Sequence, residues 1–280
     1  VALYAEKWDV AAQAARDCAT AEGNLDLSEN GYAKIFELGI NSPEVLFAVE
    51  FKSSVIDHAY DAYVRPSGDT KELGKQVYSG FVPTSELVDS YEMAGDGGNF
   101  SWEKHGKDPY ANREPRFYAT ILYNGADWMG RKIESFVGGK DGYKAYENAG
   151  AAGTTVTGYY LRKYLIDGDK TWVTSGSGQD WIVLRYAEVL LNKAEALAME
   201  NWNKNSAEAL QALNDVRARV GLPARATADK ETFLEYVRHE RKVELAGEGF
   251  RYWDLRRWRL AEKVIDGQNV HGVKISKQSD

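Results

Sequence analysis

Hydrophobic positions recur at helical spacing in the last third of the chain. From residue 181, the string "WIVLRYAEVLLNKAEALAME" places leucine and alanine every three or four positions, which is typical of one buried helix face. A polar turn, "NWNKN", follows. The next string, "SAEALQALNDVRARVG", repeats the spacing with Ser206 as a predicted N-cap, Gly221 as the C′ residue and Pro223 as the stop. We therefore expect an antiparallel helical hairpin over 181–223, similar to a tetratricopeptide repeat.

Two further helices are predicted, one on each side of this hairpin in the sequence. Residues 3–22 include "LYAEKWDVAAQAARD", an alanine-rich string suited to close helix–helix packing, and Gly23 follows it as a terminator. A third helix is expected from about Lys230 to Ala246. The chain is therefore predicted to be mainly α, with tetratricopeptide-like helix pairs.

The region between residues 23 and 180 has weaker periodicity and frequent glycine. "PTSELVDSYEM" (83–93) predicts one short helix, while 44–51, 116–125 and 157–165 have the residue types of strands or extended segments. A structureless loop of such length is uncommon inside a compact domain. We therefore expect a folded but irregular, partly β insertion, rich in loops.

Charges and aromatic rings are dense in "EGFRYWDLRRW", which runs from Glu248 to Trp258. The preceding helix also carries charges on the face of its core residues. Isolated charges at such positions are strongly unfavourable, whereas paired and hydrogen-bonded ones are tolerated. We interpret the region as a mutually neutralising ion network that is structural and does not form a pocket. Its predicted members are Glu240, Arg241, Glu244, Glu248, Arg251, Asp254 and Trp258.

Composition narrows the class of protein. Hydrophobic residues make up 44% of the 280 positions, enough for a core, and the net charge of −7 argues against non-specific nucleic-acid binding. One cysteine, Cys18, excludes an internal disulfide and a cysteine-type zinc site. No apolar run is long enough to span a bilayer. The first residues, "VALYAEKWDV", are not a signal peptide and look like the inside of a helix.

Motifs for catalysis find little support. His239-Glu240 begins a zinc-protease motif, but Val243 occupies the place of the second histidine, and no nucleophile elbow is present. The strings at 96–99 and 167–170 are expected to be Asx turns rather than cation sites. We therefore predict a protein that is not an enzyme and has no cofactor or metal. Carboxylates are plentiful, so a glycoside hydrolase stays as a weaker alternative.

The irregular region carries aromatic residues among glycine, asparagine and aspartate. A sugar ring has an apolar C–H face that an aromatic plane fits and a polar rim that hydrogen-bonding side chains fit. Loops on a rigid frame are where binding residues gather. Trp128 directly follows the strand at 116–125 and is the candidate best suited to the core. The candidate ligand contacts are Trp102, Tyr110, Trp128, Tyr143, Tyr146 and Trp172.

Three strings in order carry a family resemblance: "LRYAEVLLNKAEAL", "ALNDVRARVGLP" and "VRHERKVELAGEGFRYWDLRRW". They resemble the C-terminal half of SusD/RagB proteins, which are glycan- and nutrient-binding lipoproteins of the Bacteroidetes outer membrane. "YAEKWDVAAQAARD", "SPEVLFAVEF" and "EPRFYATILYNG" resemble earlier pieces of the family in the same order. Two departures are Gly247, where the family usually has a bulky residue, and Glu114, where aspartate is common.

The resemblance implies a SusD-like α/α superhelical fold in which residues 1–280 form the C-terminal part of the domain. It divides them into a first helix (1–22), a ligand-recognition region (23–180), the hairpin (181–223) and a C-terminal helix with a packing segment (224–280). The family's N-terminal half, with its signal peptide and lipidated cysteine, is not in this sequence.

The implied function is non-catalytic capture of an oligosaccharide or other nutrient at the extracellular face of the outer membrane. The resemblance further implies delivery to a SusC-like TonB-dependent transporter, with the membrane reached only through an N-terminal lipid anchor absent from this chain. The rival hypothesis is a tetratricopeptide-type protein–protein interaction module, because helical repeats present extended grooves.

Overall fold

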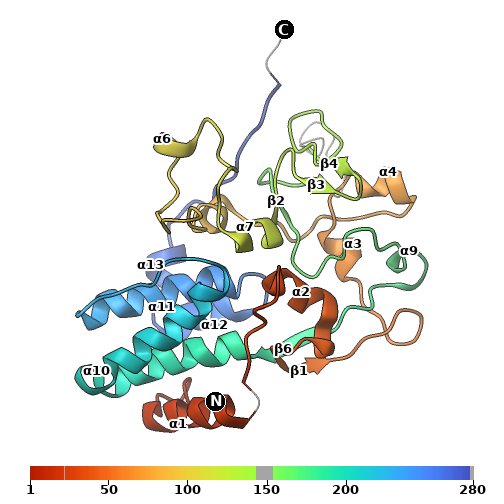
Figure 1. Cartoon of the computed structure of the whole chain (residues 1–280). Coiled ribbons are helices and arrows are strands. Elements are labelled where there is room, and N and C mark those ends of the chain that lie inside the picture. Colours follow the sequence, from red (N-terminus) through yellow and green to blue (C-terminus); the bar gives the residue numbers. More distant parts are fainter. Residues whose placement is uncertain (22, 143–153, 278–280) are drawn as a thin grey trace. The chain divides into compact units, whose positions relative to one another are not determined.

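The computed structural model describes residues 1–21, 23–142 and 154–277, and it is mainly helical, as predicted (Figure 1). The chain forms two compact units, each assembled from segments far apart in the sequence. Unit 1 comprises residues 1–48, 90–116 and 182–268, and unit 2 comprises residues 49–89, 117–181 and 269–280.

The predicted hairpin is present in unit 1 as α10 (Tyr186–Arg219), whose helical conformation breaks at Asn201 with φ −164° and ψ 94°. The side-chain oxygen of Asn201 accepts a hydrogen bond from the backbone N–H of Lys204 at 3.2 Å. This is the bonding of an N-cap, so the second helix of the pair starts several residues before Ser206, the expected cap.

The second helix of the hairpin ends at a Schellman motif, as the sequence predicts. Gly221 lies in the left-handed region with φ +72°. The N–H groups of Gly221 and Leu222 donate to the carbonyls of Ala218 and Arg217, respectively. A side chain at position 221 would strain this turn, so glycine is required there.

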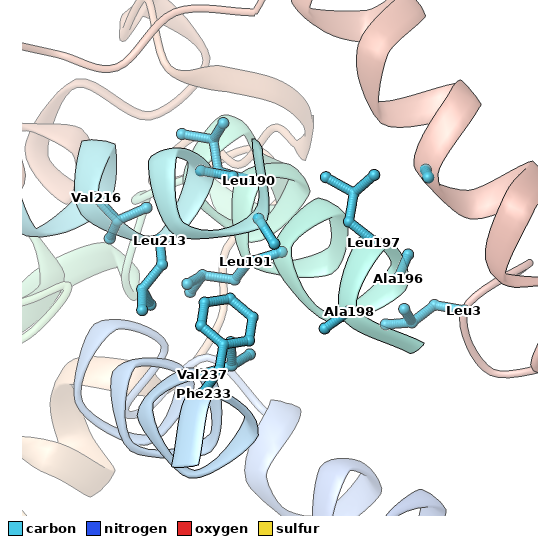
Figure 2. Packing of buried hydrophobic residues seen from close by; sticks show 14 of the residues in the cluster. Leu3, Leu190, Leu191, Ala196, Leu197, Ala198, Leu213, Val216, Phe233 and Val237 are labelled. Carbon is cyan, nitrogen blue, oxygen red and sulfur yellow. The ribbon is translucent and has the colours of Figure 1, made fainter. Parts of the chain in front are cut away.

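α10 packs between α1 (Trp8–Ala21) and α11 (Lys230–Glu244), as Figure 1 shows. Small side chains on α1, including the buried Ala12, allow the close approach of α10. Across the other interface, Leu213 and Leu191 face Phe233 and Val237 (Figure 2). Burying each such large apolar side chain contributes about 1.5–3 kcal/mol, which makes this cluster the core of unit 1.

The helix expected at 3–22 begins later than predicted. Residues before Trp8 form turns, and Glu6 has φ +54°, which a continuous right-handed helix excludes. α1 therefore occupies the second part of the expected span only.

Strands β1 (Val45–Val49) and β6 (Trp181–Arg185) pair with each other. β1 confirms the strand expected at 44–51. β6 corrects the expectation that the helix begins at residue 181, because the string "WIVLR" forms a strand first. Its β-branched and aromatic residues suit the pairing, and tertiary contact overrides the helical spacing that follows.

The remaining helical pieces of unit 1 are short. They are α2 (Gly31–Leu38), η1 (Gly39–Asn41), α6 (Trp102–His105), α12 (Phe250–Arg257) and α13 (Ala261–Ile265). The turn between α11 and α12 contains Gly247 and Gly249, with φ +77° and +86°. Gly247 is a departure from the family resemblance seen in the sequence, and the backbone conformation at this position favours glycine.

Unit 2 is irregular and partly β, as the sequence predicts. Its helices are short and its strands pair two at a time (Figure 1). Its described residues include the helices α3 (Tyr60–Val64), α4 (Asp69–Leu73), α5 (Ser85–Val88) and α9 (Trp172–Ser175). The strand pairs are β2 (Ile121–Leu122) with β5 (Tyr160–Leu161), and β3 (Asp127–Trp128) with β4 (Arg131–Lys132).

The strand expected at 116–125 is wrong for its first half. α7 (Pro115–Thr120) occupies that part, and β2 follows directly. Proline at the first position of α7 favours a helix start, because its fixed φ is already helical and its missing N–H is not needed there. The alternation of residue types in "RFYATILYNG" did not reveal this.

Buried carboxylates and arginines form a continuous carboxylate–arginine network in unit 1. The Arg116 guanidinium contacts Glu114 at 2.6 Å, Glu240 at 2.5 Å and Glu244 at 2.9 Å. All four side chains are at most 1% exposed. One arginine thus joins the 114–116 segment to two successive turns of α11.

The same network continues through Arg185, at the end of β6. Its guanidinium contacts Glu44 at 2.8 Å, Glu244 at 2.6 Å and Glu248 at 2.7 Å. Arg219 also contacts Glu44 and Glu244. Burial alone would raise the pKa of Glu244. The neighbouring arginines instead hold this pKa well below its ordinary value. Glu244 therefore stays ionised in the core.

A second branch of the network holds α12. Arg241 donates to Asp254 at 2.8 Å, and Arg257 contacts both Asp254 at 2.9 Å and Glu195 at 2.5 Å. The indole N–H of Trp258 donates to Glu195 at 2.8 Å. These bonds tie α12 to α10 and α11.

The buried carboxylate of Glu92 makes the free energy of unfolding depend on pH. It accepts from Arg217 and contacts Arg225, each at 2.9 Å. Burial would raise the pKa of Glu92, but Arg217 and its other partners hold it far below the ordinary 4.5. A lowered folded-state pKa stabilises the protein above the unfolded-state pKa, and this contribution is lost as the pH falls.

We expect Glu92→Gln to lower the free energy of unfolding at pH 7 by about 3–5 kcal/mol, because the buried Arg217 loses one of its two carboxylate partners and keeps only Glu240. The difference from the unsubstituted protein should shrink as the pH falls below about 4.5. Urea unfolding at pH 7 and pH 3.5 measures both. Glu208→Gln is the matched control: the pKa of Glu208 is about 2, held by Arg16, but its side chain is 38% exposed. Solvent screening should limit that loss to about 1 kcal/mol. Equal losses for the two variants would contradict this.

Candidate functional site

Two predicted ligand contacts, Trp128 and Trp172, lie against one buried arginine in unit 2. The Arg65 guanidinium carbon is 5.2 Å from the Trp128 ring centroid and 5.3 Å from that of Trp172. The two indoles are 0% and 1% exposed, respectively. The Trp128 N–H also donates to Asp69 at 3.0 Å. The expectation that Trp128 contacts a ligand is therefore corrected: its ring is part of the core.

Arg65 holds the segments around this stack together. It donates to Asp61 at 2.7 Å and to the backbone carbonyls of Ile166 and Asp169 at 3.3 and 3.1 Å. Asp61 accepts a further bond from Gln179 at 2.7 Å. The charge of Arg65 is thus compensated and its donors are used, so α3 is fixed to the segment between residues 164 and 180.

Arg131 extends the ion pairing of unit 2. It contacts Asp69 at 2.8 Å and Asp141 at 2.7 Å. Burial alone would lower the pKa of Arg131, but Asp141 and Asp69 raise it above its ordinary value. This cluster therefore ties α4, through Asp69, to β4, through Arg131.

A pocket of about 730 Å³ is lined in part by Trp172 and by Ala62 of α3. Most of its lining groups are hydroxyls, charged groups and small side chains. The lining residues are Ser54, Asp57, His58, Ala59, Ala62, Lys75, Trp172, Thr174, Ser175, Gly176 and Ser177. Such a lining suits a polar ligand that can accept and donate several hydrogen bonds.

Two strands of backbone form the pocket wall. His58 and Ser177 exchange backbone hydrogen bonds of 3.1 and 2.8 Å. Gly176 has φ +78°, and a Cβ there would lie 2.5 Å from the carboxyl carbon of Asp57. Glycine is therefore required where the two segments approach most closely, which accounts for the "GSGQ" string at 176–179.

The imidazole of His58 is fixed as a structural group. Its Nδ1 accepts from the backbone N–H of Tyr60 at 3.2 Å. Nε2 therefore carries the proton and donates to the carbonyl of Gln179 at 2.9 Å. Both ring nitrogens are used, so His58 presents neither a free base nor a free metal ligand to the pocket.

Three aromatic residues form an exposed surface beside the pocket: Tyr63 of α3, and Tyr78 and Phe81 of the segment that follows α4. Tyr63 and Tyr78 stack with centroids 5.1 Å apart and an interplanar angle of 27°, and Phe81 lies 6.5 Å from Tyr63. Their exposed fractions are 46%, 47% and 64%, respectively. We name these three residues the aromatic shelf. Tyr63 directly follows the pocket residue Ala62 in α3, so the shelf and the pocket adjoin.

Backbone bonds hold the aromatic shelf in place. The N–H of Tyr78 donates to the carbonyl of Ala62, and that of Gly80 donates to the carbonyl of Tyr63, both at 2.7 Å. Ser79 has φ +46° and donates its hydroxyl to the Arg65 carbonyl at 2.9 Å. The rings are therefore fixed relative to α3 while their faces remain exposed.

Comparison with known proteins places this architecture in one family. The model of the SusD family matches residues 43–280. This chain belongs to the SusD family. It is 32% identical over 133 residues to SusD-like protein P38 of Formosa agariphila, a match that covers 44% of this chain and 25% of that protein.

Solved SusD-like structures share the fold over nearly the whole chain. A SusD-like protein from Bacteroides fragilis superposes with a TM-score of 0.82 at 26% identity, covering 98% of this chain and 55% of that one. A SusD-like carbohydrate-binding protein from the same species gives 0.78 at 27% identity, with 97% and 52% covered. This SusD-family chain thus spans about half the length of these solved relatives.

The other predicted contacts of this SusD-family chain lie in different places. Trp102 is 43% exposed and Tyr110 is half-buried, and both belong to unit 1. Tyr143 and Tyr146 lie outside the described residues. The four described candidates are therefore divided between the two units, two in each.

None of the residues interpreted as an ion network lines this pocket, but one of them, Trp258, lines a second concave surface in unit 1. Arg251 and Trp258 are half-buried, and burial lowers the pKa of Arg251, with Asp254 opposing that shift. The other members are buried: Glu240, Arg241, Glu244, Glu248 and Asp254.

The aromatic shelf was missed in the sequence. Its signal was present in the string "YSGF" at 78–81, where two rings flank a serine-glycine turn. A turn places neighbouring side chains outside the core, so paired rings in a turn point to a surface use. Tyr63 gives no such signal, because its spacing in "AYDAYV" equally fits a buried helix face.

Metal binding and membrane insertion are two other functions on which the described residues bear. Within residues 1–21, 23–142 and 154–277, no cluster of three or more histidine, cysteine, aspartate or glutamate side chains could hold a metal ion. Asp96 and Asp169 instead accept from backbone N–H groups two residues on, each at 2.9 Å, as Asx turns do. No helix in the same part of the chain has the length and apolar character needed to cross a bilayer.

We expect Arg65→Met to lower the free energy of unfolding by about 3–5 kcal/mol, because Asp61 and Asp69 lose their buried partner. Urea unfolding measures the loss, and hydrogen exchange should place it in unit 2. Lys140→Met is the control, since Lys140 and Glu72 form an exposed pair, 44% and 45% exposed. That change should leave the stability unaltered within about 1 kcal/mol. An Arg65→Met protein as stable as the control would show that the stack is dispensable.

Proposed function

We propose that this chain binds a glycan without catalysis, with sugar rings on the aromatic shelf and their hydroxyls reaching the adjoining pocket. The exposed stack of Tyr63 and Tyr78 beside Phe81 is the observation that carries the proposal. The C–H face of a sugar ring packs on an aromatic plane, and the hydroxyl-lined pocket suits its polar rim. Because the rings are fixed before binding, little conformational entropy is lost when a ligand docks.

Carbohydrate as the ligand class is supported by the relative from Bacteroides fragilis that is described as carbohydrate-binding and is 27% identical to this chain. Lys75 and Asp57 also line the pocket, where they add a hydrogen-bond donor and an acceptor to the hydroxyl groups of the wall. The Lys75 ammonium is held 2.8 Å from the Trp172 carbonyl and 5.3 Å above its ring centroid. It therefore supplies a fixed charge at the pocket edge. Trp172 stays in the proposal as part of the wall.

Capture at the cell surface and delivery to a SusC-like TonB-dependent transporter are the biological role that we propose with this binding. Membership of the SusD family supports it. In this role the protein concentrates the glycan and hands it on unchanged.

Hydrolysis is not part of the proposal. A glycosidase needs two carboxyl groups facing the substrate. The carboxylates Glu92, Glu240 and Glu244 are buried and held by arginines. They are committed to the fold of unit 1.

We expect Tyr63→Ala and Tyr78→Ala each to weaken glycan binding about tenfold or more, because each removes a stacking surface. Affinity electrophoresis against a set of neutral and anionic polysaccharides finds a ligand, and isothermal titration with oligosaccharides cut from it measures the loss. Melting temperatures should stay unchanged, since both rings are about half exposed.

Trp102→Ala is the matched control, because Trp102 is a similarly exposed ring in unit 1. It should leave the affinity unaltered. Loss of binding in Trp102→Ala with retention in the Tyr63 and Tyr78 variants would move the site to unit 1 and overturn the proposal. If no polysaccharide of the set binds and the chain captures a protein partner, the protein-interaction module is favoured instead.

We expect Arg241→Met to lower the melting temperature while the affinity per folded molecule stays the same. Arg241 bonds Asp254 at 2.8 Å and Asn192 at 2.7 Å inside unit 1, and it does not line the pocket. Calorimetry gives the melting temperature, and titration corrected for the folded fraction gives the affinity. A variant that folds normally and no longer binds would show that the network takes part in recognition.

A further inference from the structure

A second concave surface lies in unit 1 and carries an excess of positive charge. Its volume is about 470 Å³, and it is formed by the residues before α1 and by side chains of α10, α11 and α12. We name it the arginine groove. It is lined by Leu3, Tyr4, Glu6, Trp8, Glu195, Met199, Leu234, Arg238, Arg256, Arg257, Trp258 and Arg259. Four arginines thus face two glutamates in a protein whose net charge is −7.

Two of the four arginines are already compensated. Arg257 uses both oxygens of Glu195, at 2.5 and 2.7 Å, and Arg238 contacts Glu235 at 2.6 Å. Glu195 also accepts from the indole of Trp258, so this carboxylate is fully occupied. The positive charge of the groove must therefore come from the remaining arginines.

Arg256 and Arg259 have no carboxylate partner among the described residues. Arg256 donates to the Tyr252 hydroxyl at 2.7 Å, and both arginines are exposed. The negative end of α12 favours cations nearby, which accounts for Arg256 and Arg257. Arg259 is the left-handed residue of the turn that ends α12, with φ +56°: its N–H and that of Leu260 donate to the carbonyls of Arg256 and Leu255. The end of α12 therefore places both arginines on the groove.

Aromatic rings are interleaved with these charges. Trp258 lies between two guanidinium groups, with Arg257 4.6 Å and Arg238 5.7 Å from its ring centroid. Tyr4 is 45% exposed and lies under Arg257 at 5.4 Å. Arg256 is also held by rings, since its guanidinium carbon lies 5.4 Å from the Tyr252 centroid and 6.0 Å from that of Trp253, and it has edges free for bonds to an anion.

We propose that the arginine groove binds an anionic sugar residue, whose carboxylate or sulfate group is held by Arg256 and Arg259 and whose ring packs beside Tyr4. Guanidinium groups match the geometry of both oxyanions. The proposal rests on the glycan-binding function proposed above and gives it a substrate class. The groove in unit 1 and the aromatic shelf in unit 2 are separate sets of residues, so each can be tested alone.

The test compares three defined oligosaccharides by isothermal titration: oligogalacturonate for the carboxylate, a carrageenan oligosaccharide for the sulfate ester, and a neutral glucan oligosaccharide. We expect at least one anionic probe to bind, with an affinity that falls as the salt concentration rises. The double variant Arg256→Gln/Arg259→Gln should weaken that binding about tenfold or more. Which of the two anionic probes binds distinguishes a uronate from a sulfated sugar.

Lys104→Gln/Lys107→Gln is the matched control, since it removes the same charge from exposed positions of unit 1 that do not line the groove. It should leave the affinity unaltered. Both double variants should melt like the unsubstituted protein, because Arg256 and Arg259 hold no carboxylate. If the two double variants weaken binding of the anionic probe equally, net charge alone explains the binding, and the proposed role of the arginine groove is overturned.

Failure of this inference can be told from failure of the proposed function. If neutral glycans bind through Tyr63 and Tyr78 and neither anionic probe responds to Arg256→Gln/Arg259→Gln, only the groove is overturned. If no probe binds at all, both proposals are overturned. If the anionic probe binds and only Tyr78→Ala weakens it, the anion is recognised at the aromatic shelf and the groove is again overturned.

Discussion

Charge compensation inside unit 1 is the constraint on which the rest of this structure depends. Arg116, Arg185 and Arg219 each contact the single carboxylate of Glu244, which is fully buried. A charge removed from water in this way is tolerated only if partners surround it. The three arginines come from different parts of the chain, so these parts must meet before the carboxylate of Glu244 has all its partners. The network therefore specifies which segments meet as well as how firmly they hold.

The helical frame was readable from the sequence because its signals are local. Leucine and alanine spacing predicted the hairpin, and Gly221 ends it as expected. Predictions from the sequence were wrong where contacts with residues distant in the sequence decide the structure. The string at 181–185 forms a strand because β1 is there to pair with it, and the first half of 116–125 is a helix that starts at Pro115.

The candidate site was less predictable, for a physical reason. An aromatic residue in an irregular region can face solvent or core, and only its neighbours decide. Trp128 and Trp172 are buried because both rings pack against the guanidinium group of Arg65. Tyr63 and Tyr78 stay outside because the backbone of 78–80 is bonded to α3 and leaves their faces uncovered. No spacing rule in the sequence encodes either outcome.

Anchoring through the main chain has a consequence for how such a protein can change over generations. The carbonyls of Ala62 and Tyr63 hold the 78–80 turn whatever side chains stand at 78 and 81. Replacements there can alter what is recognised without disturbing how the unit folds. If the aromatic shelf binds the ligand as proposed, ligand preference is thereby separated from foldability, and related proteins can come to bind different ligands on one unchanged frame.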